Sequence, residues 1–562
     1  MHSNLAQPEV KPVSLKPQPI GPVPEETARV ARAAFPKGNA FMRIRDELGV
    51  LWEDEDFSDL FPTRGQPALA PWRLALVTVM QFAENLPDRR AADAVRARID
   101  WKYALGLELA DPGFDFSVLS EFRARLLEGG AEQLLLERML ERFGEKGWVR
   151  VRGRQRTDST HVLAAVRVLD RLECVGETVR AALNALAVAA PEWLKERATE
   201  EWFARYGRPV DEHDLPKGIS AREDYAETIG RDGMRLLAWI DAEDAPGFAW
   251  LGNVPAVGLL RRTWKNQYRL EGDEPLWREA KELPPAGARF DSPYDPDARF
   301  GNKRSKRWSG YKLHLTETCD EDLPRVVTRV ETTPAHLSDV AQTGKVHEDL
   351  ARRGLLPAEH LADAGFVDAE LLVRSASEHG VELIGPVRPN VGWQARTEGG
   401  YDISRFTVDW EAKEATCPEG KQSRTWTSTT TNWGAPAVVV RFGRKACREC
   451  ESRALCTRSK EEPRHLTLRP NKEEHEVIQA ARVGQKTPEW KSKYDERAGI
   501  EGTFSRAASV LGVRRARYRG QEKVQLEHVL TAVALSVLRT VKWLAGTPPV
   551  KRRVSAFAEL AA

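Results

Sequence analysis

The sequence predicts a mixed α/β core that is interrupted by two insertions and preceded by an all-helical domain. Three observations support this fold class. Helical periodicity fills residues 41–148, strand-like runs alternate with helices over residues 149–387, and two long stretches of different character separate the elements of the core. At 562 residues the chain is too long for one ordinary domain, so several units are expected.

The composition is that of a globular protein, and its charge is informative only locally. Hydrophobic residues make up 41% of the chain and charged residues 30%, which provides material for a large core. A formal net charge of +2 gives no global argument for nucleic-acid binding. Basic clusters are present at Lys303-Arg304, Lys306-Arg307, Arg514 to Arg519 and Lys551 to Arg553. Each cluster alone fits either a phosphate-backbone surface or a solvated face.

The sequence favours a cytoplasmic protein without a membrane partner. No stretch approaches the roughly 20 uninterrupted apolar residues of a membrane span. The start of the chain lacks the charged and apolar regions of a signal peptide. Six cysteines in so long a chain do not suggest a secreted disulfide framework.

The ends of the chain and the N-terminal helical run are predicted from composition and periodicity. Residues 1–40 are rich in proline and polar groups and are predicted to form a flexible tail, and residues 546–562 are predicted to form a C-terminal tail. Residues 41–148 are predicted to form a helical domain. Such a domain either places a helix in a DNA groove or packs as a plain bundle on the next domain.

The predicted core extends over residues 149–545. Its expected elements, in chain order, are strands at Val149–Leu163, Trp308–Leu315 and Arg325–Val330, a helix at Leu337–Arg353, a strand at His360–Asp363, a helix at Ala369–His379 and a strand at Val381–Val387. This order is that of an RNase H-like sheet, in which acids lie at adjacent strand ends. Residues 170–290 are interpreted as a helical insertion and residues 400–470 as a β-rich, cysteine-containing insertion. Helices are expected again at Glu474–Ala508 and Gln521–Leu544.

Three carboxylates are candidates for a metal site. Asp158 lies on the first strand, Asp363 ends a later short strand, and Glu501 lies in a helical segment. Phosphodiester chemistry uses two divalent ions roughly 4 Å apart that neutralise the attacking and leaving oxygens. Carboxylates suit Mg²⁺ or Mn²⁺ as ligands. Among 83 acidic residues, a solvated surface position is the alternative for each acid taken alone.

Glu501 has further support in its neighbours. Tyr494, Arg497 and Glu501 stand at i, i+3 and i+7, so a continuous helix would carry them on one face. Arg497 would then orient Glu501 or contact a phosphate. A plain intrahelical ion pair is the alternative.

Taken together, the three acidic segments and Trp308 to His314 resemble bacterial insertion-sequence transposases of the DDE type. The Tyr494-xx-Arg497-xxx-Glu501 spacing resembles the Y-R-E-K signature of the IS-four-like superfamily. The run Ile99 to Leu107, with Phe114 to Ser117, resembles the family's N-terminal helical domain. The basic residue of the signature would fall at Ala508, so the cluster Arg514 to Arg519 is the candidate for that phosphate contact.

The resemblance implies a function and a set of site residues. Asp158, Asp363 and Glu501 would form the metal-binding catalytic triad for Mg²⁺ or Mn²⁺. Metal-activated water would cleave at the element's ends, and the freed 3′-hydroxyl would attack target DNA. The partners would be double-stranded DNA, as terminal inverted repeats and target, and at least a second copy of the chain in the bacterial nucleoid. The expected DNA-binding residues are Lys312, Tyr494, Arg497, Arg514, Arg515, Arg517 and Arg519. His161 and His314 either contact a phosphate or an acid, or simply pack.

Four of the six cysteines lie in the β-rich insertion. Cys447 and Cys450 have the two-residue gap that lets both thiolates face one tetrahedral Zn²⁺. Cys417 and Cys456 would complete the site, and free buried thiols are the alternative. Four thiolates would close the site, so this zinc would be structural.

Two other functions share these features. A nuclease that cleaves without strand transfer would use the same acids, and sequence does not separate it from a transposase. A DNA-binding protein derived from a transposase would have lost catalysis, which the presence of all three acids opposes. A zinc hydrolase lacks an open set of histidine and carboxylate ligands.

Overall fold

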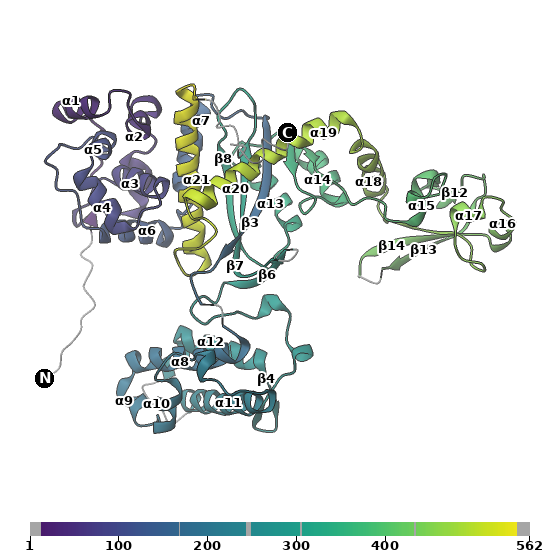
Figure 1. The fold of residues 1–562 in the computed structure, drawn as a ribbon, viewed down its shortest axis with the longest axis horizontal. Helices are drawn as coiled ribbons and strands as arrows, with labels where there is room; N and C mark the ends of the chain where they lie inside the picture. Colours follow the sequence, from purple (N-terminus) through teal and green to yellow (C-terminus); the bar gives the residue numbers. More distant parts are fainter. Residues whose placement is uncertain (1–12, 168, 243–248, 304–305, 432–433, 548–562) are drawn as a thin grey trace, which may run out of the picture.

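The computed structural model describes residues 13–547 except 168, 243–248, 304–305 and 432–433. Figure 1 shows a central sheet with the N-terminal helices on one side, a helical lobe below it and an arm that extends from the other side. Some predictions lie outside the described residues. They concern residues 1–12, residues 548–562 with the cluster Lys551 to Arg553, and Arg304.

The sheet of the core has six strands and mixed pairing. Its order is β10-β9-β3-β7-β6, and β8 also pairs with β7. β3 is antiparallel to β7 and parallel to β9, and β9 is parallel to β10. The strands are β3 (Arg154–Leu163), β6 (Arg299–Lys303), β7 (Lys306–Thr318), β8 (Val327–Pro334), β9 (Glu359–Ala362) and β10 (Glu382–Ile384).

The sequence predicted all of these strands except β6, with ends that are longer, shorter or shifted. The antiparallel hairpin of β7 and β8 is confirmed. β3 begins five residues after the predicted Val149, because residues 149–153 contain a turn with Arg152 at a positive φ of 57°. β10 is shorter than the predicted Val381–Val387.

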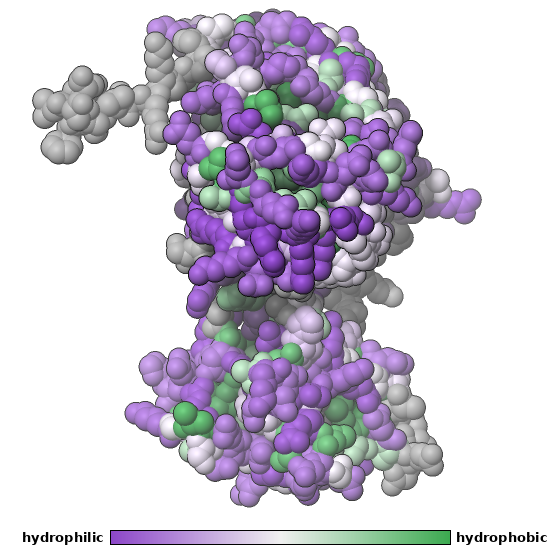
Figure 2. All heavy atoms as spheres, turned by 90° about the vertical axis from the view of Figure 1, so that its right-hand side faces the viewer, coloured by the Kyte–Doolittle hydropathy of each residue, from purple (hydrophilic) through white to green (hydrophobic). Residues whose placement is uncertain are grey.

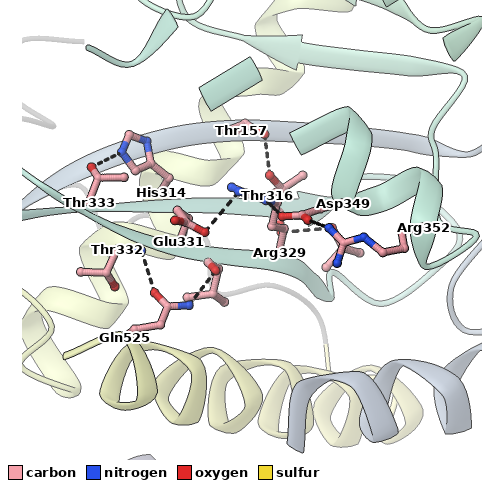
Figure 3. A network of polar contacts seen from close by, with 12 residues as sticks. Thr157, His314, Thr316, Arg329, Glu331, Thr332, Thr333, Asp349, Arg352 and Gln525 are labelled. Carbon is pink, nitrogen blue, oxygen red and sulfur yellow. Dashed lines mark hydrogen bonds and ion pairs between the residues drawn. The ribbon is translucent and has the colours of Figure 1, made fainter. Parts of the chain in front are cut away.

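The long helix α21 (Gln521–Leu544) joins the sheet to the N-terminal helices, as Figure 1 shows. Its buried residues belong to one continuous hydrophobic cluster with β7, β8 and the N-terminal helices. Gln525 fixes it to β8, since its side chain accepts from Thr332 N at 2.7 Å and donates to Val330 O at 3.0 Å (Figure 3). Of the described residues, only α21 is long and apolar enough to cross a membrane, and 83% of its apolar window is buried inside the protein, as in a core helix.

The helix α13 (Val340–Arg352) lies on the other side of β8 from α21 (Figure 3). The buried Arg329 of β8 holds it there, donating from Nε to Asp349 at 2.6 Å and from Nη2 to Glu331 at 3.2 Å. The sheet is therefore covered on two faces by helices that polar side chains fix to it.

The N-terminal helices pack on one another, and some of them also pack on α21. They are α1 (Glu25–Ala34), α2 (Ala40–Arg43), α3 (Pro71–Ala83), α4 (Asp88–Ala97), α5 (Ile99–Leu105), α6 (Ser117–Glu128) and α7 (Leu134–Glu145). Of these, α3 and α7 make the most extensive contacts with α21. The helical character predicted for residues 41–148 is confirmed in these elements.

The prediction of a flexible tail over residues 1–40 is wrong for α1. Thr27 is buried and donates to Leu107 O at 2.8 Å, and Ala31 is buried against Tyr103. Proline and charge in this segment suggested disorder. They instead mark helix ends, because Glu25 and Glu26 follow Pro24 at the N-terminus and Arg32 lies in the last turn.

The two insertions form units with separate cores. The helical lobe contains α8 (Arg171–Ala189), α9 (Pro191–Lys195), α10 (Glu200–Tyr206), α11 (Ile219–Asp241), α12 (Pro255–Gln267) and the unpredicted hairpin β4 (Tyr268–Glu271) and β5 (Glu274–Trp277). Its core includes Trp193, Trp202 and Trp264. Figure 2 shows this lobe as a separate mass beneath the main body, with hydrophobic residues exposed among hydrophilic ones.

The arm is the β-rich insertion. It contains β11 (Thr407–Asp409), β12 (Glu414–Thr416), β13 (Ser423–Thr430), β14 (Pro436–Phe442), β15 (His465–Leu468) and the short helices α15 (Trp393–Arg396), α16 (Arg444–Arg448) and α17 (Arg453–Cys456). β13, β14 and β15 form an antiparallel sheet whose buried face includes Val440 and Leu466. The β-rich character expected of residues 400–470 is confirmed by these strands.

The buried Glu527 of α21 gives the fold a testable pH dependence. It is 3% exposed, and its carboxylate accepts from Arg517 N at 2.9 Å. Burial raises the pKa of Glu527 to about 7, against the effect of this hydrogen bond. Unfolded chains ionise a glutamate near pH 4.5, so the fold should lose up to about 3 kcal/mol as pH rises from about 4.5 to 7.

We predict that Glu527→Gln removes this loss, because a neutral amide oxygen accepts the same hydrogen bond without a buried charge. Thermal unfolding at pH 5 and pH 8 measures the effect. The Tm of the variant minus the Tm of wild type should be larger at pH 8 than at pH 5. An equal Tm difference at both would contradict the prediction.

Candidate active site

The first two candidate acids meet at adjacent strands. β3 and β9 are parallel, and Thr157 pairs with Ala362, so Asp158 and Asp363 occupy the next position on each chain. Asp158 is largely buried, and Ser159 N donates to its Oδ1 at 2.7 Å. Burial raises the pKa of Asp158, Arg497 opposes this, and the charge of Asp363 adds to it. The two carboxylates are therefore close enough to repel each other.

Arg497 links the third acid, Glu501, to Asp158. Arg497 Nη1 lies 3.0 Å from Asp158 Oδ2, and Arg497 Nη2 lies 2.9 Å from Glu501 Oε1. The side chains of Arg497 and Asp158 are each 14% exposed, whereas that of Glu501 is 64% exposed. The guanidinium thus bridges a buried acid and an open one, and the structure brings together all three predicted acids.

The sequence predicted that one continuous helix carries Tyr494, Arg497 and Glu501. This prediction is wrong. Tyr494 lies in the last turn of α19 (Pro488–Asp495), Arg497 lies in a 3₁₀ turn, and Glu501 lies on α20 (Gly499–Val510). Arg156 Nη1 donates to Glu496 O at 2.6 Å, so a side chain from β3 enters the helical hydrogen-bond ladder there. Arg497 still lies over the Tyr494 ring, 5.7 Å from its centroid.

A buried ion network fixes α20 against the sheet. Glu317 of β7 is fully buried and accepts from Arg156 at 2.8 and 2.5 Å, from Arg539 at 2.8 Å and from Thr503 at 2.7 Å. Burial opposes the ionisation of Glu317, but Arg539 and Arg156 outweigh it and lower its pKa. Thr503 lies on α20 two residues after Glu501, so this network fixes the helix that carries the third acid.

A fourth carboxylate, Asp339, lies beside the site and was missed by the sequence reasoning. It accepts from Ser159 Oγ at 3.1 Å and from Lys312 Nζ at 3.0 Å, and Lys303 Nζ is 3.6 Å away. Burial opposes its ionisation, but Lys312 lowers the pKa of Asp339 on balance. Asp339 precedes α13 in a polar turn, and nothing local distinguishes it from an ordinary helix-start aspartate.

The other predicted DNA-binding residues have different surroundings. Lys312 is largely buried on Asp339. Arg514 and Arg515 are exposed, and Arg514 Nε donates to Thr160 Oγ1 at 3.3 Å. Arg519 is exposed near Tyr294.

Arg517 faces the N-terminal helices instead. It donates to Asn85 and to Leu86 O, and it lies over the Phe82 ring. Its guanidinium is thus committed to packing between units, although it belongs to the same sequence cluster as Arg514. Ala508, at the signature's basic position, is partly buried against the main core.

The two candidate histidines are not equivalent. His314 is buried, bonds to Thr333 at 3.0 Å and has its pKa lowered to about 3 by burial. His161 is half-buried against Trp308, with the ring centroids 5.8 Å apart. Burial, followed by the charges of Lys306, Arg514 and Lys303, lowers the pKa of His161 to about 4. The charges of the β6–β7 hairpin and of Arg514 therefore both act on His161, which lies on β3 beyond Asp158.

The four cysteines of the arm gather around one place. Cys417, Cys447 and Cys456 pack beside the same small core. Lys421 N donates to Cys417 Sγ at 3.3 Å, in a turn where Gly420 has a φ of 73°. Burial raises the pKa of Cys456 to about 11; Arg464 lowers it, and the charges of the other three cysteines raise it.

The donor chemistry fits the expected metals at both places. Carboxylate oxygens suit Mg²⁺ or Mn²⁺, and four thiols suit Zn²⁺. Within the described ranges, no three histidine, cysteine, aspartate or glutamate side chains are grouped closely enough to hold an ion as they stand. Side-chain rotation would therefore have to accompany binding.

Comparison with known families gives two matches. A model of a transposase DDE domain matches residues 416–541, a range that contains Glu501 and the arm's cysteines. A model of a transposase domain (DUF772) matches residues 29–125, in the N-terminal helices. Asp158 and Asp363 lie outside both ranges. A search of curated proteins found no match.

The contact between Arg156 and α20 makes a prediction for two nearby glycines. A Cβ at Gly499 would lie 2.1 Å from Arg156 Nη1, whereas a Cβ at Gly502 would meet nothing within 4 Å. We predict that Gly499→Ala lowers the free energy of unfolding by about 1–3 kcal/mol, because the clash disturbs a buried ion network. Gly502→Ala, the control on the same helix, should be neutral or stabilise by up to about 1 kcal/mol. Denaturant titration measures both, and equal effects would refute this role of Gly499.

Proposed function

We propose that this chain, a DDE transposase of the insertion-sequence type by its two transposase domains, cuts double-stranded DNA at the ends of its element and joins them to target DNA. The observation that carries the proposal is the bridge of Arg497 between Asp158 and Glu501, with Asp363 on the adjacent strand. Acids distant in sequence have no structural reason to converge on one open place, and convergence costs repulsion.

The core would be RNase H-like. Its support is the order β8-β7-β3-β9-β10, in which three antiparallel strands are followed by two that run parallel to β3. In such a sheet, acids of the central strand and its parallel neighbour lie side by side. Asp158 and Asp363 have that relation, and α20 brings Glu501 to them.

Asp158, Asp363 and Glu501 would hold Mg²⁺ or Mn²⁺. When bound, these ions supply charge neutralisation at the attacking and leaving oxygens and a nucleophile near neutral pH. The chain's own residues have the remaining tasks. Ser159 N orients Asp158, and Lys312 neutralises Asp339 beside the acids. The Glu317 network holds α20, the helix that carries Glu501, against the sheet.

The phosphates of the DNA backbone would bind the cationic side chains near His161. Lys303 and Lys306 pair at the end of the β6–β7 hairpin, and Arg514 reaches the same place from the segment after α20. A cluster of cations beside the acids provides the charge that a phosphate backbone requires. Arg515 and Arg519 extend this basic surface.

The N-terminal helices would bind the element's ends. Their match to a transposase domain supports this role. We expect at least two copies of the chain to act together, because two DNA ends must be joined, and we expect them to act in the bacterial cytoplasm at the nucleoid. The alternative of a nuclease without strand transfer shares the site but leaves the N-terminal transposase domain without a task.

The arm would hold a structural zinc ion through Cys417, Cys447, Cys450 and Cys456. Three of these cysteines pack beside the small hydrophobic core of the arm, and so small a core needs a cross-link to be stable. Four thiolates would close the site, so the ion would stabilise the arm and take no part in catalysis.

We predict that replacing any of the three acids abolishes DNA cleavage. Purified protein with Mg²⁺ or Mn²⁺ should cut DNA that carries the terminal repeats, and Asp158→Asn, Asp363→Asn and Glu501→Gln should each reduce the rate by at least about 10²-fold. Asp495→Asn, which changes an exposed acid near Tyr494, is the control and should keep the rate. Full activity of Asp158→Asn would exclude the proposed site.

We predict about one zinc ion per purified chain, lost in Cys447→Ser. Elemental analysis of both proteins measures it. Cys174→Ala, which changes a buried thiol in the helical lobe, should retain the metal. The absence of zinc from wild-type protein purified without chelators would refute a zinc site.

A further inference from the structure

Arg497 occupies the space between the acids rather than their periphery. Its two terminal nitrogens each bond a different acid, at 3.0 and 2.9 Å, and its side chain is 14% exposed. The charge of Asp363 also acts on it. A single guanidinium therefore interacts with all three carboxylates that the proposed function assigns to the metal.

This arrangement differs from an ordinary surface ion pair. Exposed pairs contribute little and are easily exchanged for water. Here Asp158 is buried to the same extent as Arg497, so Asp158 has lost its hydration and needs a cation. The guanidinium meets that need in the absence of a divalent ion. It also keeps Glu501, which is otherwise open to solvent, turned towards Asp158.

The same contact opposes the binding of a divalent ion. A carboxylate oxygen that accepts a hydrogen bond from Arg497 presents less of its negative charge to a metal ion. The guanidinium of Arg497 would also repel a divalent cation bound about 3–4 Å away. Arg497 must therefore release at least one acid before both can ligate.

We propose that Arg497 is an internal counter-cation that holds the three acids together before the divalent ion arrives and competes with that ion for Asp158 and Glu501. The proposal rests on the proposed function, because it takes the three acids to be the metal ligands. It makes Arg497 a positioning residue with an unusual consequence. Removing its charge should strengthen metal binding even while it harms the reaction.

The test is calorimetric titration of Mn²⁺ into the full-length protein without DNA. Arg497→Gln, which keeps a hydrogen-bonding group but loses the charge, should bind Mn²⁺ about tenfold more tightly than wild type. Arg497→Lys keeps the charge and should bind close to wild type. Arg506→Gln removes an exposed charge elsewhere on α20 and is the matched control for net charge. Asp158→Ala gives the level of binding without the site.

Thermal unfolding is a second measurement, and it shows whether Arg497→Gln alters the stability of the fold. Arg497→Gln leaves Asp158 buried without its cation, so the metal-free variant should have a lower Tm than wild type. Saturating Mn²⁺ should raise the Tm of Arg497→Gln by more than that of wild type, because the ion replaces the missing charge.

The outcomes separate the two proposals. Tighter Mn²⁺ binding by Arg497→Gln, but not by Arg497→Lys or Arg506→Gln, supports the competition. Equal or weaker binding by Arg497→Gln, with wild type still binding more than Asp158→Ala, overturns the competition and leaves the proposed site intact. If neither wild type nor Arg497→Gln binds more Mn²⁺ than Asp158→Ala, both proposals fail.

Discussion

The candidate site depends on a buried carboxylate that is not part of it. Glu317 is fully buried and bonds to Arg156 of β3, Thr503 of α20 and Arg539 of α21. Removing one partner of such a network leaves an uncompensated charge, at a cost of about 3–5 kcal/mol. The network therefore fixes the distance between the strand that carries Asp158 and the helix that carries Glu501. Apolar packing alone tolerates sliding of a helix on a sheet, whereas these directional bonds do not.

This constraint explains how the chain accommodates two large insertions. The helical lobe lies between β3 and β6 in sequence, and the arm lies between β10 and α18 (Lys472–Gly484). Each has its own hydrophobic core, so neither is needed to complete the central one. The acids lie far apart in sequence but are positioned by strand pairing and by Glu317. Insertions can then change in length without moving the site, since they leave from loops at the surface.

The sequence predicted what local pattern determines. The alternation in β7, the uninterrupted apolar stripe of α21 and the strand that carries Asp158 follow from periodicity, and the structure confirms all three. The sequence could not predict the features that depend on partners distant along the chain. The break between Tyr494 and Glu501 comes from Arg156, and the role of Asp339 comes from Ser159 and Lys312. The cluster Arg514 to Arg519 divides in the fold, because Arg517 turns to the N-terminal helices while Arg514 stays near Thr160.

Charge balance unites these findings. Asp158, Asp363, Glu501 and Asp339 lie near one another, and four carboxylates cannot gather in one place without cations. Lys312 and Lys303 neutralise Asp339. Arg497 bridges Asp158 and Glu501, while no comparable ion pair in the described part of the chain involves Asp363. The site is thus held in a partly neutralised state that is stable enough to fold and still short of positive charge. That remaining deficit at Asp363 is what would draw a divalent ion into the site, and Arg497 is the group that such an ion would have to displace.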